Sequence, residues 1–143
     1  MNKSNMLSFL LESDLSLIGE KATRQPFKEG EVVLKEGTIS HSLYRLMKGA
    51  VKVVTHVRGE EVVVARLGPG ELLGVASLLN GSAIAATVVA SEESEFELIA
   101  AHDLQSLLES VPGLAVRFYR SLGSVLANRL DLVLNQVAQP TTA

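Results

Sequence analysis

The sequence predicts a mainly β fold with flanking helices, and three observations support this. Short aliphatic and β-branched runs recur about every ten residues between residues 27 and 100, often with glycine between them. Apolar residues at helical spacing precede and follow this region. The length of 143 residues is enough for one domain with a proper core, and too short for two ordinary domains. We therefore expect one domain over 13–138.

Within this domain we expect a helix over 13–24, a β region over 27–100 and helices over 101–138, with tails at 1–12 and 139–143. The first helix is indicated by Ser13 and Asp14, which offer acceptor side chains at its start. Leucine, isoleucine and alanine then follow at positions 15, 17, 18 and 22. Pro26 is predicted to end this helix, because proline disrupts the interior of a helix.

The β region is predicted to be antiparallel. Arg58 and Gly59 are expected to turn a hairpin, because glycine readily adopts the positive φ that such turns require. Other glycines fall between or beside the remaining runs. The expected strands are Glu31–Lys35, Leu43–Met47, Val51–Val57, Glu61–Leu67, Ala85–Ala90 and Glu95–Ala100.

The pattern after Ile99 is helical again. Asp103 falls in the expected first turn, where a carboxylate interacts favourably with the helix dipole. Pro112 and Gly113 are predicted to interrupt the helix. A long helix is then expected from about Leu114 to Val137, ending before Pro140.

Composition narrows the classes of function. Apolar residues make up 47% and charged residues 20%, and the formal net charge is -3, so no general attraction to nucleic acid or anionic membranes is expected. Cysteine is absent, which excludes disulfides and thiol catalysis. No secretory-type cleavage site and no stretch of about 20 apolar residues is present, so we expect a cytoplasmic protein with no membrane contact.

No catalytic or metal-binding pattern is recognisable. His41, His56 and His102 lie in three separate segments without the spacing of metal ligands. A nucleophile-elbow motif is also missing. We therefore predict that the chain is not an enzyme and holds no cofactor or metal.

One segment carries a resemblance to a known family. The run from Gly74 to Ala90 resembles, without a gap, the phosphate-binding cassette of cyclic-nucleotide-binding domains in catabolite-activator-type regulators and kinase regulatory subunits. The segments Phe27–Gly37, Leu43–Val51 and Leu67–Gly74 are similar to other parts of that family. The resemblance implies a jelly-roll β-roll, also described as a double-stranded β-helix, with a long C-terminal helix.

The resemblance also implies where a nucleotide would be held. Val75 stands where the family places a ribose-binding Glu, and Ile84 where it places a phosphate-binding Arg. Neither side chain can form a charged hydrogen bond, and the loss of two such bonds, at about 1.5–3 kcal/mol each, predicts binding weaker by about two to four decades. The polar groups that remain are hydroxyls or backbone N–H groups, and they belong to Ala76, Ser77, Ser82, Ala85 and Ala86.

Three interpretations of the altered pocket stay open. Val75 and Ile84 are core residues of a closed pocket, or the pocket takes an apolar or uncharged ligand, or weak cyclic-nucleotide binding persists. Val133 and Leu134 fall near the position from which the family caps the base, so they are candidates for an apolar lid. Alignment along a helix can be displaced by one turn.

The C-terminal helix presents a wide apolar arc, more than one packing partner requires. It is either buried against its own domain or paired in a parallel homodimer, as the resemblance implies. Arg129 lies within the arc, where it is expected to pair with a carboxylate or extend to solvent. The residues proposed for a two-helix seam are Tyr119, Leu122, Leu126, Leu130, Val133 and Val137.

The sequence thus predicts a stand-alone regulatory module that has lost cyclic-nucleotide binding and acts as a dimer through contacts with an unknown protein partner. The alternatives are a small-molecule sensor and a cupin-like enzyme. DNA binding is not expected, because no helix-turn-helix follows the long helix in this sequence.

Overall fold

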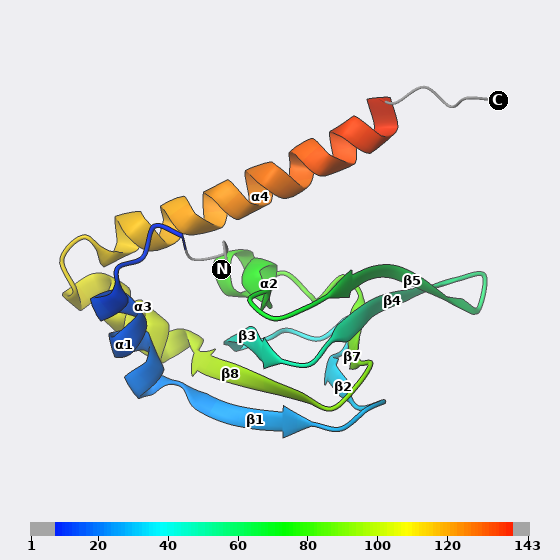
Figure 1. The fold of residues 1–143 in the computed structure, drawn as a ribbon, viewed down its shortest axis with the longest axis horizontal. Coiled ribbons are helices and arrows are strands. Elements are labelled where there is room, and N and C mark those ends of the chain that lie inside the picture. Colours follow the sequence, from blue (N-terminus) through cyan, green and yellow to red (C-terminus); the bar gives the residue numbers. More distant parts are fainter. Residues whose placement is uncertain (1–7, 139–143) are drawn as a thin grey trace.

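A computed structural model describes residues 8–138, except for the side chains of residues 132, 133 and 136–138. Four helices and eight strands are assigned within these residues (Figure 1). Their bounds are α1 Glu12–Lys21, β1 Thr23–Phe27, β2 Val32–Leu34, β3 Ser42–Lys48, β4 Val51–Val57, β5 Glu60–Leu67, β6 Leu72–Leu73, α2 Val75–Asn80, β7 Thr87–Ala90, β8 Ser94–Ala100, α3 Ala101–Ser110 and α4 Leu114–Ala138.

The strands form two antiparallel four-stranded sheets. One sheet has the order β1-β8-β3-β6 and the other has the order β2-β7-β4-β5. Helices α1 and α3 lie together at one end of the roll, while α4 starts beside them and runs over α2 (Figure 1). The predicted mainly β fold with flanking helices and a long C-terminal helix is confirmed.

The first hydrophobic cluster lies between the two sheets. Phe96 on β8 is fully buried at its centre, and its ring makes edge contacts with Phe27 at 5.5 Å and Tyr44 at 5.9 Å between centroids. Such aromatic pairs contribute about 0.5–1.5 kcal/mol beyond the area they bury. Residues of both sheets complete this inter-sheet cluster, including Leu46 on β3 and Val88 on β7.

A second cluster lies between the sheet that contains β3 and the helices. It contains Leu43 from β3 and Ile99 from β8, packed against Leu104 of α3 and Phe118 of α4. The strands β3, β6 and β8 contribute residues to both clusters. Both faces of these three strands are therefore covered, whereas β1 at the edge of the sheet is mostly exposed.

The first helix differs from the prediction. It covers Glu12–Lys21, and the chain then continues directly into strand β1, which contains Pro26. Pro26 therefore does not end the helix. Strand β1 is at an edge of its sheet, where a residue without a backbone N–H can be accommodated because its outer side has no ladder partner among the described strands.

The remaining elements agree more closely with the prediction. Arg58 and Gly59 both have positive φ, 55° and 83°, so this pair does turn the β4–β5 hairpin. Gly113, with φ of 77°, separates α3 from α4. The two-residue strand β6 was not predicted, and β7 starts at Thr87 rather than Ala85.

A buried ion pair joins the start of α1 to α4. Asp14 is 1% exposed and accepts two hydrogen bonds from the guanidinium of Arg117, each 2.7 Å long. It also accepts from the backbone N–H of Leu11 at 2.9 Å, as expected for an acceptor near the helix start. The backbone N–H of Phe9 donates to the hydroxyl of Ser121 at 2.9 Å. We call these contacts the N-terminal clamp.

Candidate functional site

The segment from Gly74 to Ala90 begins at a position that requires glycine. Gly74 has φ of 84° and directly precedes helix α2. A Cβ atom built on it would lie 2.9 Å from the carbonyl oxygen of Ser42 on β3. Both the backbone conformation and this close approach therefore exclude a side chain, and together they fix where α2 starts.

The polar groups of the loop after α2 bind one another. The hydroxyl of Ser77, which is buried, donates to the carbonyl oxygen of Ser82. The N–H of Gly81 donates to the carbonyl of Ser77 at 2.8 Å, which ends the helix. The Ser77 proton is thus used within the loop, while Ser82 itself is exposed to solvent.

The two positions identified from the sequence pack on different clusters. Val75 is partly buried against the cluster beneath the helices. Ile84 is partly buried against the inter-sheet cluster. The N–H of Ile84 donates to Thr38 at 2.7 Å and its carbonyl accepts from Gly37 at 2.8 Å, so a turn distant in sequence holds this loop.

The cassette carries no charge of its own. No Lys, Arg, Asp or Glu occurs between Gly74 and Ala90. Ala76 and Ala85 are exposed and Ala86 is partly buried, so what these three positions offer is backbone rather than functional side chains. The local chemistry of the segment is that of an uncharged loop with its hydroxyls engaged or facing water.

A groove of about 340 Å³ lies between α2 and α4. Its walls are mostly apolar and include Val75 and Leu79 of α2 and Val125 and Leu126 of α4. Arg129 also lines it and forms an ion pair with Glu71. This pairing agrees with the expectation that Arg129 meets a carboxylate.

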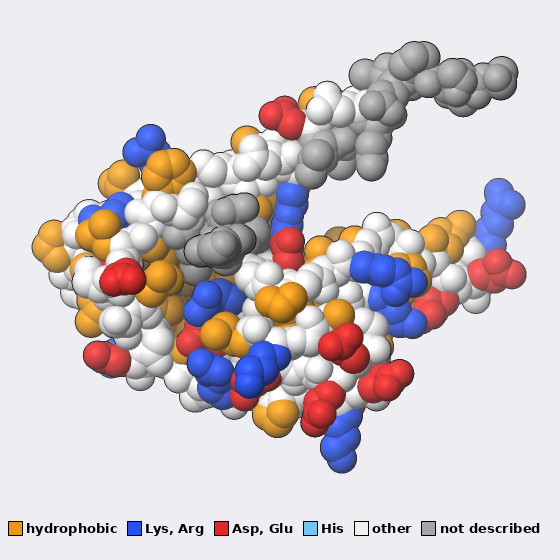
Figure 2. Space-filling view, in the orientation of Figure 1, with side chains coloured by type: hydrophobic (Ala, Val, Ile, Leu, Met, Phe, Trp, Pro, Cys, Tyr) orange, Lys and Arg blue, Asp and Glu red, His pale blue; other side chains and the backbone are white. Residues whose placement is uncertain are grey.

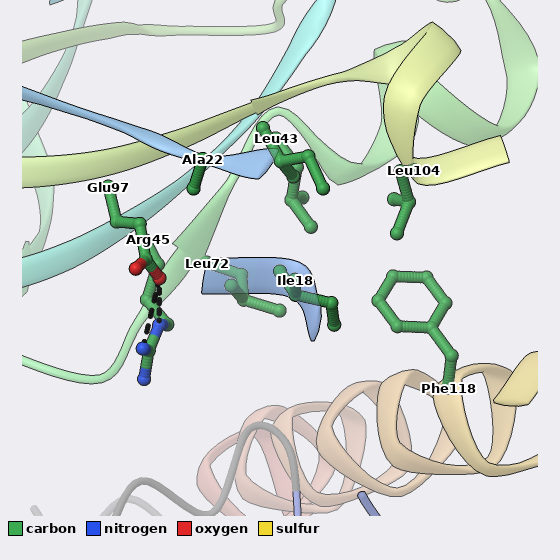
Figure 3. A pocket seen from close by; sticks show the side chains of 9 residues that line it. Ile18, Ala22, Leu43, Arg45, Leu72, Glu97, Leu104 and Phe118 are labelled. Atoms are coloured by element: carbon green, nitrogen blue, oxygen red, sulfur yellow. Dashed lines mark hydrogen bonds and ion pairs between the residues drawn. The ribbon is translucent and has the colours of Figure 1, made fainter. Parts of the chain in front are cut away.

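A smaller cavity of about 20 Å³ lies behind the sheet, between α1, the strands and α4 (Figure 3). Ile18, Leu43 and Phe118 point into it. The guanidinium of Arg45 and the carboxylate of Glu97 meet at its rim, 3.0 Å apart. This volume holds about one water molecule, so the cavity is a packing gap rather than a ligand site.

The seam predicted on α4 is only partly at the surface. Leu126 and Leu130 are 49% and 57% exposed, and Tyr119 is also exposed. Leu122 is 4% exposed and belongs to the cluster beneath the helices, so this member of the predicted seam is a core residue. The side chains of Val133 and Val137 lie outside the described residues.

The exposed stripe follows a different set of positions. Val116, Tyr119, Gly123, Leu126 and Leu130 are spaced by three and four residues in alternation, and all are exposed. We call these five residues the α4 stripe. Gly123 takes the place that sequence reasoning gave to Leu122. The spacing of three and four residues can be read from the sequence, but Gly123 has no apolar side chain, and the prediction therefore used its neighbour Leu122.

The lid proposed from the sequence consists of Val133 and Leu134, and only the side chain of Leu134 is among the described residues. Leu134 is largely exposed and is absent from the walls of the groove beside α2. The distal half of α4 continues past α2 without another helix beside it (Figure 1). The side chain of Val133 again lies outside the described residues.

Among the described residues, no three carboxylate or imidazole side chains come together to hold a metal ion. None of the helices there combines the length and the apolar character needed to cross a bilayer.

Comparisons with known proteins agree with this geometry. A family model for the cyclic nucleotide-binding domain matches residues 24–111. The chain is 30% identical over 131 residues to the cyclic AMP receptor protein of Thermus thermophilus, covering 91% of this chain and 59% of that protein. It is 33% identical over 118 residues to the cAMP-dependent protein kinase regulatory subunit of Hypocrea atroviridis, covering 82% and 24%.

Solved structures show the same architecture. The catabolite activator protein of Thermus thermophilus superposes with a TM-score of 0.78 at 29% identity, covering 94% of this chain and 63% of that chain. A cyclic nucleotide-binding domain from Methylobacillus flagellatus reaches 0.83 at 19% identity, covering 97% and 84%. The chain spans less than two thirds of the curated relatives named above. It belongs to the cyclic nucleotide-binding domain family.

Proposed function

We propose that this chain is a regulatory module of the cyclic-nucleotide-binding fold that has lost cyclic-nucleotide binding and acts as a dimer through contacts with a protein partner. One observation carries the proposal. Val75 and Ile84 occupy the positions that the family resemblance gives to the ribose-binding Glu and the phosphate-binding Arg, and both side chains pack on apolar clusters. The cassette around them is uncharged.

The energetics of a buried phosphate support this reading. An anion moved out of water needs a cation or several hydrogen bonds to offset its desolvation. The Ser77 proton is already donated to Ser82, and both arginines that line the neighbouring groove and cavity are paired with carboxylates. A cyclic nucleotide would therefore meet an apolar surface where its phosphate requires charge.

Isothermal titration with cyclic AMP and with cyclic GMP tests the loss of binding. We expect no saturable heat at micromolar nucleotide, because two charge-assisted contacts are missing. A dissociation constant in the micromolar range for either nucleotide contradicts the proposal.

A gain-of-binding variant tests the cause. The double variant Val75→Glu, Ile84→Arg restores both charged side chains, and the variant Val75→Gln, Ile84→Met has similar bulk without charge. If circular dichroism shows both folded, we expect the charged variant to bind cyclic AMP at least about tenfold more tightly than its control. Equal binding by the two variants contradicts the assignment of the loss to these positions.

The dimer is supported by the α4 stripe. Its residues recur at spacings of three and four, the pattern by which two helices pack along a seam. At low micromolar concentration, sedimentation of the wild type should give twice the monomer mass, and Leu130→Glu should give the monomer mass with unchanged circular dichroism. An unchanged mass at that concentration for a folded Leu130→Glu variant argues against the seam.

A second candidate function is a small-molecule sensor, and the groove beside α2 favours it. A volume of about 340 Å³ with mostly apolar walls is within the range of small-molecule sites. A thermal-shift screen with uncharged and apolar metabolites tests this candidate. Leu79→Trp, which fills the groove, is expected to remove any shift, and a shift that persists in this variant contradicts binding at the groove.

A further inference from the structure

Strand β5 is an unusually open edge. It ends the order β2-β7-β4-β5, so no strand among the described residues pairs with its outer side. Other edges are protected: β1 contains Pro26, while β2 and β6 have three and two residues. Strand β5 has eight residues and no proline. Long unpaired edges of this kind present backbone N–H and C=O groups to another chain.

The middle of this edge is apolar. Val62, Val63 and Val64 are each more than a third exposed, with Val64 at 55%. Val57, across the hairpin on β4, is exposed as well. Figure 2 shows hydrophobic side chains along the projecting hairpin, with basic and acidic side chains around its tip. A β-branched run on an open strand is the composition that pairs most readily with a further strand.

The charges on β5 are arranged for antiparallel pairing with an identical strand. Glu60 and Glu61 precede the three valines, and Arg66 follows them. Within its own sheet Arg66 lies opposite Lys52, a like charge, and it has no ion pair among the described residues. An antiparallel copy centred on Val63 places Glu60 of one chain opposite Arg66 of the other, twice.

We propose that β5 pairs antiparallel with β5 of a second copy of this chain about a two-fold axis near Val63, which joins two four-stranded sheets into one of eight strands. The valines of the two copies are then neighbours at the centre of the paired strands. At each end, Glu60 and Glu61 of one copy lie beside Arg66 of the other. Parallel pairing is disfavoured, because it places Glu on Glu and Arg on Arg.

The irregularity in the hairpin does not remove this complementarity. The β4–β5 register shifts by one residue between Val53 and Val54, which leaves Val64 without a direct partner on β4. If the outer edge of β5 has the same one-residue shift, Arg66 of the second copy lies opposite Glu61 instead of Glu60. Since both residues are acidic, Arg66 meets a carboxylate in either register.

This contact is separate from the α4 dimer of the proposed function. Strand β5 and helix α4 are different elements, so each can form its own two-fold interface. A chain with two such interfaces assembles beyond a dimer when both are occupied. Loss of association through α4 can therefore be distinguished from loss of association through β5 by substitutions in one element at a time.

Sedimentation of variants at rising protein concentration tests the inference. Leu130→Glu removes the α4 seam, and this variant is expected to remain a dimer at high concentration through β5. Adding Val63→Lys places two like charges together at the axis, and should weaken the remaining association by about tenfold or more. A folded Leu130→Glu variant that is purely monomeric at about 0.5 mM overturns the proposal and leaves the α4 dimer unaffected.

A charge exchange gives a second, independent outcome. In the Leu130→Glu background, Arg66→Glu should weaken self-association, because each end then places acid against acid. Adding Glu60→Arg and Glu61→Arg should restore it. Within its own chain, residue 66 lies opposite Lys52, so Arg66→Glu removes no attractive charge pair from the monomer. Association that survives both Val63→Lys and Arg66→Glu overturns pairing at β5.

Discussion

The carboxylate of Asp14 joins the start of α1 to α4, two segments that are far apart in the sequence. It accepts from the Arg117 side chain on α4 and from the Leu11 backbone before α1. It is almost completely buried, whereas Arg117 is partly exposed. A buried carboxylate is stable only with such partners, so the N-terminal clamp depends on this residue.

Replacing Asp14 should therefore reduce stability measurably. Asp14→Asn keeps the shape but removes the charge and one acceptor, and we expect a loss of about 1.5–3 kcal/mol in the free energy of unfolding. Urea denaturation measures this. The exposed pair of Arg24 with Glu95 provides the control, because Arg24→Gln should change stability by less than about 0.5 kcal/mol. Equal effects of the two substitutions contradict the burial argument.

The same residue predicts a pH dependence. The hydrogen bonds from Arg117 hold the pKa of the Asp14 carboxyl below its ordinary value, although burial opposes them. Because the folded-state pKa is the lower one, its stabilisation is complete above the unfolded-state pKa of about 3.9 and is lost as the pH falls through the folded-state value. The stability difference between wild type and Asp14→Asn should shrink as the pH falls below about 3.9 in urea titrations. A constant difference from pH 6 to pH 2.5 contradicts this.

For single positions in the cassette, the sequence gives the residue type and its place in the family alignment, but not its contacts. The gapless match assigns Val75 and Ile84 to the two ligand positions of the family, and this assignment stays a prediction. The backbone contacts of Ile84 with Gly37 and Thr38 could not be read, since they join residues more than 40 positions apart. Local pattern carries no information about such pairings.

Helix α4 has two sides with different roles. Leu122 packs into the core, whereas Leu126, one turn further along, belongs to the exposed α4 stripe. Leu122→Ala should lower the free energy of unfolding by about 2–5 kcal/mol, because it leaves a cavity. Leu126→Ala should cost less than about 1 kcal/mol in dilute solution and should weaken self-association. Denaturation below the dimer dissociation constant separates the two effects; similar losses contradict the assigned sides.

Elements were predicted well where periodicity is strong and poorly where tertiary context decides. The bounds of β4 were correct, because a β-branched run ends at a glycine turn. Strand β1 was missed because Pro26 reads as a helix stop, and only its place at a sheet edge makes a strand possible. The two residues of β6 are too few for any periodic signal.

At the scale of the whole molecule, the two hydrophobic clusters share their strands. Neighbouring residues Leu72 and Leu73 of β6 point into different clusters, as do Phe96 and Ile99 of β8. Neither cluster can lose its packing while the other keeps these strands in place. The fold is therefore expected to unfold as one cooperative unit.

Thermal unfolding measured by two probes tests this expectation. Far-ultraviolet circular dichroism reports all the helices, while tyrosine fluorescence reports Tyr44 beside the inter-sheet cluster and Tyr119 on α4. In the Leu130→Glu background, where the α4 seam is removed, both signals should give one midpoint. Two separated transitions contradict the coupling of the clusters.

The overall architecture could be predicted because order and spacing of elements are properties of the whole chain. The division of α4 into buried and exposed sides could not, since Leu122 and Leu126 are the same residue type one turn apart. Which leucine faces the core depends on the angle at which α4 crosses α3 and the sheet. This crossing angle is set by tertiary packing and cannot be read from the residues of α4 alone.

The N-terminal clamp also gives α4 the mechanics of a lever. Asp14 and Ser121 hold the helix within its first eight residues, and its core contacts end at Val125. The ion pair of Arg129 with Glu71 holds the helix once more beyond that point, which leaves residues 130–138 as an arm of nine residues, about 14 Å long. A tilt of about 10° at that ion pair displaces the far end by about 2.4 Å, more than the rise of one helical residue. The displacement that a small tilt produces is therefore largest at the tip of the helix.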